Sequence, residues 1–515
     1  MKRRCDGRAS TIVHHLRHRE LQHRYAPQPP RYERAHMLSY LSWDSSTTIN
    51  PNGRVELYVK RPLLMTLRSD RQDVYMSQDE TYEHRIPPFH VAFSEKRMHG
   101  TLLAVADEEG WVSLFTTHDR KPHLPQHHQS CNHERPMSKF SAHQNAIFDL
   151  IWCSDDAHIA TASGDQHLSV WDVETSAKLC HFEGHSMSVK CVRQMPGSPH
   201  VFASGSRDGN VYFWDTRHPY PVSSDPNGVA TFRPVDSCIR CHDFDSSATD
   251  RRKKRRMSIP NAQRSVTCVE FTGDGNQLIS SGAVDGMVKF WDLRAMEKDA
   301  FKLVRSFSCL NPNGRRYGIS SLTLDHTKTK LLVSAASNDI FLYDLVRATN
   351  DPVAKYYGHK NSSFYVKSGF SPDSNFVVSG SVDHNVYIWD AQSAGAPAVV
   401  LRGHEGEVSS VVWCKADFSK IASCSDDGTV RVWHMGHDMD ETSMLQNTTS
   451  SCGRGCHVGR AEVYPESPMP SSTIHGLVVA HAPPASVTIS PAAAATTSRP
   501  SAAAAQPTTL HHFWK

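Results

Sequence analysis

Histidine and aspartate recur in this chain at regular intervals, and both residue types serve in general acid–base catalysis. His143, His185, His359 and His404 each precede a tryptophan by 28 to 30 residues, and an aspartate lies six residues before each of those tryptophans. A catalytic pair is needed only once, so a pair at a fixed place in every repeat favours a structural role. No phosphate-binding loop, zinc-protease helix or nucleophile elbow is present. We predict that the protein is not an enzyme.

Two other groups carry side chains that bind metals. They are Cys452, Cys456 and His457, and the histidines His123, His127, His128 and His133. The first group has no second Cys/His pair at zinc-finger spacing, and the second lacks regular ligand spacing. We interpret them as unpaired thiols in a flexible tail and as a solvated loop. The sequence therefore predicts no metal site and no cofactor.

Short strands are expected to position the repeated side chains. In Phe202–Trp214, two β-prone runs flank an Asp-Gly turn, which is a strong hairpin signal. The same hairpin recurs before Trp291 and before Trp433. Repeats of about forty residues that end in Trp-Asp are typical of β-propeller blades. We expect the His, Ser or Thr, Asp and Trp of one repeat to form a buried hydrogen-bond chain.

Seven copies of the repeat can be identified. Four carry both the histidine and the tryptophan, and a fifth is placed at Ser265–Arg294. Two weaker copies, Phe89–Phe115 and Ser320–Asp344, should lack the full polar network. The sequence therefore predicts an all-β fold, a seven-bladed WD40 β-propeller. A strand from within 54–86 should close the ring, and Leu63–Leu67 is our choice for it.

The propeller is expected to span residues 54–436, with a basic insertion at about 218–264. The strand pattern stops after about Gly436. Residues 437–515 are rich in Ser, Thr, Ala and Pro, and they are predicted to be disordered. The basic segment 1–53 is also expected to be disordered. A hydrophobic content of 39%, low for a compact protein of this size, agrees with unfolded ends.

Composition limits the protein class. The formal net charge is +3, so no global field for nucleic acid is implied. No apolar run approaches the roughly 18 residues of a membrane span, so no membrane partner is expected. The 13 cysteines have no framework spacing and follow a polar N-terminus without a signal peptide. We interpret them as reduced thiols of a cytosolic or nuclear protein.

One run of six cations must be exposed, because it cannot pack in a core. It consists of Arg251, Arg252, Lys253, Lys254, Arg255 and Arg256. Such a run in a loop is typical of a nuclear-import signal, so we predict nuclear localisation. Residues 1–36 carry nine Lys or Arg against three Asp or Glu. The sequence leaves open whether that segment contacts DNA directly.

Two neighbouring repeats end in Trp-Asp-x-Arg, as Trp214-Asp215-Thr216-Arg217 and as Trp291-Asp292-Leu293-Arg294. The Trp and Asp belong to the repeat, but blade stability does not require the arginine. We expect Arg217 and Arg294 to project from one face of neighbouring blades. A planar, permanently charged fork suits the carboxylates or carbonyls of a protein partner.

The last residues form a second candidate contact. Leu510, Phe513 and Trp514 have aliphatic-x-x-aromatic-aromatic spacing. In a short 3₁₀ turn the three side chains point the same way and make an apolar plug. Exposed aromatic residues favour association, so we interpret this end as a docking peptide.

Beyond the generic repeat, residues 87–436 resemble the denticleless family. The strings that carry the resemblance are Ala142–Leu150, Gly282–Gly286, Asn361–Ser368 and Ile421–Asp427. The basic insertion also lies where this family has one. Members of the family are substrate receptors of a cullin-RING ubiquitin ligase that acts in S phase and after DNA damage.

The resemblance implies that the ligase's adaptor, the large damaged-DNA-binding protein, binds the Trp-Asp-x-Arg motifs and bridges to the cullin scaffold. The candidate contacts are Trp214, Asp215, Arg217, Trp291, Asp292 and Arg294. It further implies substrates that are docked on the DNA sliding clamp. These are a replication-licensing factor, a cyclin-dependent kinase inhibitor and a histone lysine methyltransferase, marked for proteasomal degradation.

The C-terminal peptide is similar to a clamp-interacting box, but it departs from the full pattern. Pro507 stands where the box has glutamine, and Trp514 replaces the usual Phe or Tyr. A weakened or clamp-variant-specific contact is the hypothesis that follows. An alternative function is a non-ligase WD40 scaffold of a chromatin complex, which would hold a histone tail and show no cullin association.

Overall fold

The computed structural model divides the chain into two compact units, Met1–Pro465 and Glu466–Lys515. All residues whose structure is described belong to the first unit. They are residues 63–70, 73–77, 85–96, 99–117, 136–217, 229–242, 265–297, 300–309, 316–347, 349–435 and 458–464. The predictions for residues 1–53, the basic run 251–256, the two metal-ligand groups and the C-terminal peptide lie outside these residues.

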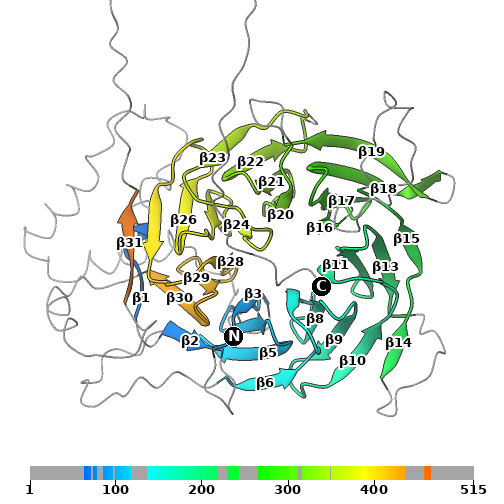
Figure 1. Ribbon diagram of the computed structural model, residues 1–515, viewed down its shortest axis with the longest axis horizontal. Helices are drawn as coiled ribbons and strands as arrows, with labels where there is room; N and C mark the ends of the chain where they lie inside the picture. Colours follow the sequence, from blue (N-terminus) through cyan, green and yellow to red (C-terminus); the bar gives the residue numbers. More distant parts are fainter. Residues whose placement is uncertain are drawn as a thin grey trace, which may run out of the picture. The chain divides into compact units, whose positions relative to one another are not determined.

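The first unit is built from mainly antiparallel sheets arranged around a ring (Figure 1). One sheet contains β3 (Pro88–Phe93), β4 (Leu102–Asp107), β5 (Trp111–Thr116) and β6 (Ser138–Ser141). The next contains β7 (Ile147–Trp152), β8 (His158–Ser163), β9 (Leu168–Asp172), β10 (Lys178–Phe182) and β14 (Ala230–Phe232). A third contains β11 (Val189–Gln194), β12 (Val201–Ser206), β13 (Val211–Asp215) and β15 (Asp236–Cys238).

Two further four-stranded sheets follow along the chain. The first contains β16 (Val266–Phe271), β17 (Gln277–Gly282), β18 (Met287–Glu297) and β19 (Ala300–Ser308). The second contains β20 (Ile319–Leu324), β21 (Lys330–Ala335), β22 (Asp339–Asp344) and β23 (Ala354–Tyr357). The all-β WD40 β-propeller that the sequence predicts is therefore confirmed as the architecture.

A ten-stranded sheet completes the ring. It contains β24 (Ser368–Phe370), β25 (Phe376–Ser379), β26 (Asn385–Asp390) and β27 (Val399–Arg402). It also contains β28 (Val408–Trp413), β29 (Lys420–Ser425), β30 (Thr429–Met435), β1 (Leu67–Ser69), β2 (Val74–Met76) and β31 (Gly459–Val463). The two sets of strands are joined because β31 pairs with both β27 and β1.

The hydrophobic core lies between neighbouring sheets rather than inside one of them. Ala104 and Leu114 of one sheet pack against Ile147 and Leu150 of the next, for example. The strand β4 is buried along its whole length, because sheets cover both of its faces. A strand buried on both faces has an almost continuous apolar sequence, as Leu102–Ala106 does.

Strands from the first and the last described segments close the ring. The expected closing strand within 54–86 exists, since β1 and β2 both pair with β30. The choice of Leu63–Leu67 was wrong except for Leu67: the hydroxyl and the amide of Thr66 both donate to the Leu63 carbonyl, which makes a turn. The propeller boundary at 436 was also wrong, because β31 adds a strand at Gly459–Val463. This strand has only a short, half-exposed sequence, so no alternation pattern marks it.

The insertion predicted at 218–264 is partly built into the sheets. The strand β14 pairs in parallel with β10, and β15 pairs with β13. Each is only three residues long, too short to give a period-two signal. The described part of the segment, residues 229–242, therefore belongs to the propeller.

The predicted hydrogen-bond chain is complete in four repeats. In one of them Trp214 Nε1 donates to Ser204 Oγ (2.9 Å), and the two ring nitrogens of His185 bond Ser204 Oγ (2.8 Å) and Asp208 Oδ2 (2.9 Å). The other sets are His143, Thr161, Asp165 and Trp171; His404, Ser423, Asp427 and Trp433; and His242, Ser280, Asp285 and Trp291. His242 was not predicted from the sequence, because it lies in the presumed insertion and no glycine precedes it.

The repeat of His359 departs from the prediction. Neither ring nitrogen of His359 has a hydrogen-bond partner among the described residues, although the ring is buried. The Ser379 hydroxyl donates to the Gly380 carbonyl instead, and Trp389 Nε1 donates to the Tyr357 carbonyl. Asp383 accepts a hydrogen bond from Tyr387 (2.7 Å). The spacing of the residues in this repeat matches the pattern, but the Ser379 and Trp389 side chains donate to backbone carbonyls instead of completing the chain of hydrogen bonds with His359.

This contrast gives a testable pair of variants. We expect His242→Ala to lower the free energy of unfolding by about 1 to 3 kcal/mol more than His359→Ala does. Both variants lose a buried ring, but only the first also removes side-chain hydrogen bonds, those between the ring and the Asp285 carboxylate and Ser280 hydroxyl. Urea denaturation followed by tryptophan fluorescence measures the difference. Equal losses would show that the chain of hydrogen bonds adds nothing beyond packing.

Candidate functional site

Arg217 stands just beyond the end of β13, and its side chain is 57% exposed. Its guanidinium grips the carboxylate of Asp215: Nη2 lies 2.6 Å from Oδ2, and Nε lies 2.9 Å from Oδ1. The Asp215 carboxylate also accepts the Arg217 backbone N–H. Trp214 is fully buried and anchors the strand end. The motif thus separates into a buried anchor and an exposed fork.

Arg294 repeats this arrangement in β18. Its Nε lies 3.2 Å from Asp292 Oδ1, and the side chain is 65% exposed. A hydrogen bond from Arg294 lowers the pKa of the Asp292 carboxyl, so the pair stays charged at neutral pH. Within the described structure, Nη1 of neither Arg217 nor Arg294 has a hydrogen-bond partner. Each pair has no net charge but presents free N–H donors, which suit carbonyl or carboxylate oxygens of a partner.

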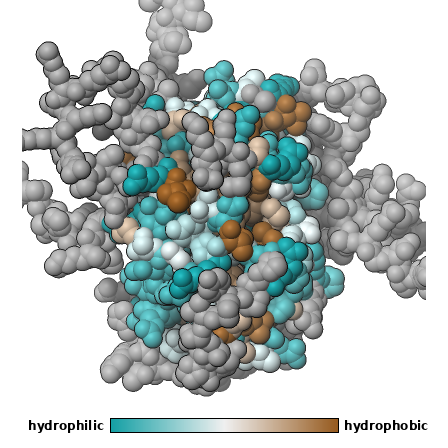
Figure 2. Space-filling view, turned by 90° about the vertical axis from the view of Figure 1, so that its right-hand side faces the viewer, coloured by the Kyte–Doolittle hydropathy of each residue, from teal (hydrophilic) through white to brown (hydrophobic). Residues whose placement is uncertain are grey.

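A third arginine lies at the equivalent end of the next sheet. Arg347 Nε stands 3.3 Å from Asp344 Oδ2, beyond the end of β22. Arg347 was not predicted from the sequence, because its spacing from the aspartate is one residue longer and Tyr343 replaces the tryptophan. Figure 2 shows the side of the ring that carries β15, β18 and β19, where hydrophobic residues lie in separate patches among hydrophilic ones. Leu303 and Val304 of β19 are among the exposed apolar residues.

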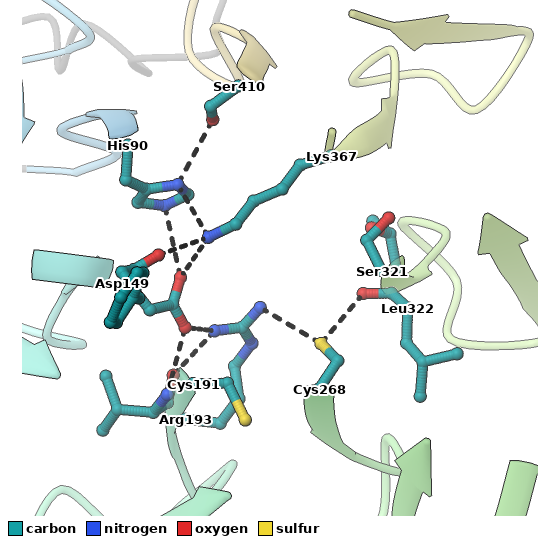
Figure 3. Close-up of polar contacts among 12 residues, drawn as sticks. His90, Asp149, Cys191, Arg193, Cys268, Ser321, Leu322, Lys367 and Ser410 are labelled. Carbon is teal, nitrogen blue, oxygen red and sulfur yellow. Dashed lines mark hydrogen bonds and ion pairs between the residues drawn. The ribbon is translucent and has the colours of Figure 1, made fainter. Parts of the chain in front are cut away.

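The other prominent site is a cluster of charged residues at the centre of the ring (Figure 3). No sequence motif predicted it. The Asp149 carboxylate, only 1% exposed, lies 2.6 Å from Arg193 Nη1 and 2.9 Å from Lys367 Nζ. It also accepts the backbone N–H of Val192 (3.0 Å). Arg193 Nε lies 2.5 Å from Glu270 Oε1. Four sheets are tied together at this point, since these residues come from β7, β11 and β16 and from the residue before β24.

The charges in this central cluster are balanced and their hydrogen bonds are satisfied. Burial opposes ionisation of Asp149, but Arg193 and Lys367 prevail and hold its pKa well below the usual range. Burial and the charge of Lys367 lower the pKa of His90 to about 3, so the ring is neutral at physiological pH. A saturated network of this kind has no free acid, base or nucleophile to offer a substrate. We interpret it as a structural ion-pair network that links the sheets across the channel.

The other predicted site residues either support the strand ends or lie outside the described residues. Asp215 is buried, and Trp291 and Asp292 are half-buried, so these residues mainly support the strand ends. Nine described cysteines are free thiols, and eight of them are buried. Leu510, Phe513 and Trp514 and the basic run lie outside the described residues. In the described ranges, no helix has both the length and the apolar character needed to cross a bilayer.

Comparison with known families agrees with this architecture. A family model described as WD domain, G-beta repeat, matches residues 134–172 and 176–215. A model described as nucleolar protein 10-like, N-terminal domain, matches residues 253–417. Together the two matches cover sheets before and after the insertion predicted at about 218–264.

Individual relatives are more informative. The chain is 38% identical to Denticleless protein homolog of Danio rerio over 403 residues, which is 77% of this chain and 59% of that protein. It is 36% identical to Denticleless protein homolog of Homo sapiens over 400 residues, or 76% of this chain and 52% of the relative. Protein lethal(2)denticleless of Drosophila melanogaster is 33% identical over 383 residues, 72% of this chain and 48% of the relative. The chain therefore spans about half the length of the curated relatives it matches.

Proposed function

Because this chain is a WD-repeat protein of the denticleless family, we propose that it is the substrate-recognition subunit of a cullin-RING E3 ubiquitin ligase. In this role it is a non-catalytic receptor. It works in the nucleus and recruits replication and cell-cycle proteins, docked on the DNA sliding clamp, for proteasomal degradation in S phase and after DNA damage. The observation that carries the proposal is the pair of exposed arginines, Arg217 and Arg294. Each is held by its own aspartate, one just beyond β13 and the other within β18 of the neighbouring sheet.

We also infer that the propeller has seven blades. The inner strands β3, β7, β11, β16, β20, β24 and β28 each contact the next around a closed circle. The ten-stranded sheet then counts as two blades, one built on β24–β27 and one on β28–β30, which β31 and β1 join. We call the edge of the ring that carries Arg217 and Arg294 the fork-bearing rim.

The adaptor, the large damaged-DNA-binding protein, would bind at the fork-bearing rim and bridge to the cullin scaffold. The charge-balanced Asp-Arg pairs favour hydrogen bonds to backbone or carboxylate oxygens rather than a long-range field. The receptor would transfer no group itself. It would raise the effective concentration of a substrate lysine beside the ligase's conjugating enzyme. The cations Arg251 to Arg256 would supply nuclear import.

The direct experiment is affinity purification of the full chain from S-phase cells, with mass spectrometry scored for the adaptor, the cullin and the sliding clamp. Recovery of the adaptor and the cullin is the expected result. Recovery of chromatin proteins without a cullin would instead support the scaffold function.

The C-terminal peptide allows a separate prediction. A peptide covering Gln506–Lys515 should bind the sliding clamp, and a peptide with Phe513→Ala and Trp514→Ala should bind at least about tenfold more weakly, because both aromatic anchors are lost. Calorimetric titration of the purified clamp with both peptides measures the ratio. Superimposable titration curves for the two peptides would contradict the clamp hypothesis.

A further inference from the structure

The inner strands share a local irregularity at the same end. In six of them the pairing register shifts at the second residue, as it does between Pro88 and His90 and between Ile147 and Asp149. The residues at these bulges are Phe89, Phe148, Lys190, Thr267, Ser320 and Ser409. A bulge leaves one residue out of the ladder and re-aims its side chain, and bulges are common at barrel rims and next to active sites. These residues therefore define one mouth of the channel.

Three aromatic rings form a platform at this mouth. Phe89 stacks on Phe148 with ring centres 5.9 Å apart, and Tyr365 stacks on both at 5.5 and 6.0 Å, all within 14° of parallel. Tyr365 precedes β24, so it reaches the platform from another part of the ring. It is 44% exposed, and its neighbour Phe364 is 41% exposed. Exposed aromatic residues that lie together on a surface favour association with a partner.

Cations stand on one flank of the platform. The ammonium group of Lys190 lies 3.3 Å from the centre of the Phe148 ring and 5.6 Å from that of Tyr365. Burial and the charge of Arg207 lower the pKa of Lys190 to about 7. The Arg207 backbone N–H donates to the Ser188 carbonyl (2.9 Å), which holds that turn beside β11. An anionic group of a partner would therefore stabilise the positive charges of Lys190 and Arg207.

Carboxylates stand on the opposite flank. Glu108 lies in the turn between β4 and β5, Glu407 precedes β28, and Asp426 lies in the turn between β29 and β30. The Asp426 backbone N–H donates to the Glu407 carbonyl (2.9 Å). Burial, together with the charges of the three carboxylates, raises the pKa of Tyr365. Burial and the other two carboxylates raise the pKa of Asp426 to about 6. In the described structure none of the three has an ion pair, so this flank would gain from a cation.

The order around the mouth is therefore acidic, aromatic, basic across four neighbouring sheets. We propose that this mouth binds an extended peptide of the protein to be modified, with an apolar side chain on the platform, a Lys or Arg toward Glu407 and Asp426, and an Asp or Glu toward Lys190 and Arg207. Its role in substrate selection rests on the proposed receptor function. A single nucleic-acid strand is disfavoured, because the carboxylate flank repels its phosphates.

The test is selection of a random twelve-residue phage-displayed library on the immobilised full chain, followed by fluorescence anisotropy with the selected peptide. We expect enrichment of a basic and an acidic residue on opposite sides of an apolar one. Tyr365→Ala should weaken the selected peptide by at least about tenfold, and Glu407→Lys with Asp426→Lys should reverse the preferred charge at that end. Arg347→Glu, in the exposed Asp-Arg pair beyond the end of β22, is the matched control and should leave peptide affinity unchanged.

Adaptor capture by the same variants separates the two proposals. Unchanged adaptor capture with no peptide consensus, or with equal peptide affinity in Tyr365→Ala, overturns the peptide site alone. A peptide consensus without any adaptor capture overturns the receptor function and leaves the site intact. Displacement of the selected peptide by oligothymidine, with loss in Tyr365→Ala, would reassign the mouth to nucleic acid and overturn the inference.

Discussion

Replacing Arg217 and Arg294 together by glutamate should abolish adaptor co-purification while the propeller stays folded. Each arginine is more than half exposed and makes its side-chain contacts with its own aspartate. The new carboxylates would lie next to the Asp215 and Asp292 carboxylates and repel them. Loss of the two guanidinium groups would also remove the side-chain N–H donors that a partner oxygen would use. Central arginines are frequent hot spots of interfaces, so we expect adaptor affinity to fall on the order of 100- to 1,000-fold. Surface plasmon resonance with purified adaptor measures this loss.

Two matched variants give this prediction its controls. Arg347→Glu changes an exposed Asp-Arg pair of one-residue longer spacing, and it should leave most of the affinity if the Trp-Asp-x-Arg geometry matters. Arg217→Lys with Arg294→Lys keeps the charge but loses the planar fork, and it should give an intermediate loss. Circular dichroism checks folding. Adaptor binding that survives the double charge reversal would exclude the forks as the contact and favour a non-ligase scaffold.

Asp149→Ala should produce the largest loss of stability, about 3 to 5 kcal/mol of unfolding free energy. The substitution leaves the half-buried cations Arg193 and Lys367 without the carboxylate that they share. It also leaves the Val192 backbone N–H without its acceptor. Urea denaturation at pH 7 measures the loss. Asp344→Ala is the control, because its arginine partner is exposed and the pair should be worth less than about 1 kcal/mol.

The same variant predicts a pH dependence. The folded pKa of Asp149 lies below its unfolded value of about 3.9, so its contribution is present above the unfolded pKa and lost as the pH falls through the folded pKa. His90 acts in the same direction: its folded pKa of about 3 lies below the unfolded value, so acid favours the unfolded chain. The stability gap between wild type and Asp149→Ala should therefore narrow below about pH 4. A gap that stays constant down to pH 2 would contradict the ion-pair explanation.

The repeat was predictable because its signals are local. Trp214, Ser204, Asp208 and His185 lie within thirty residues of one another, so spacing alone indicates one hydrogen-bond chain. Even so, spacing does not determine rotamers. His359 has every sequence partner in place, yet Ser379 turns toward the backbone and the chain of bonds does not form. The exposed forks were likewise visible in sequence, because an arginine that the blade does not need stands out against the repeat.

The sequence by itself determined the β-propeller architecture and the candidate forks Arg217 and Arg294, since both depend on short periodic patterns. Only the tertiary structure decided how the ring closes, which histidine serves Trp291, and what surrounds the channel. Asp149 and Lys367 are 218 residues apart, and Tyr365 meets Phe89 across an even longer stretch of chain. Closing the ring brings such residues together, and no local period records which of them will meet.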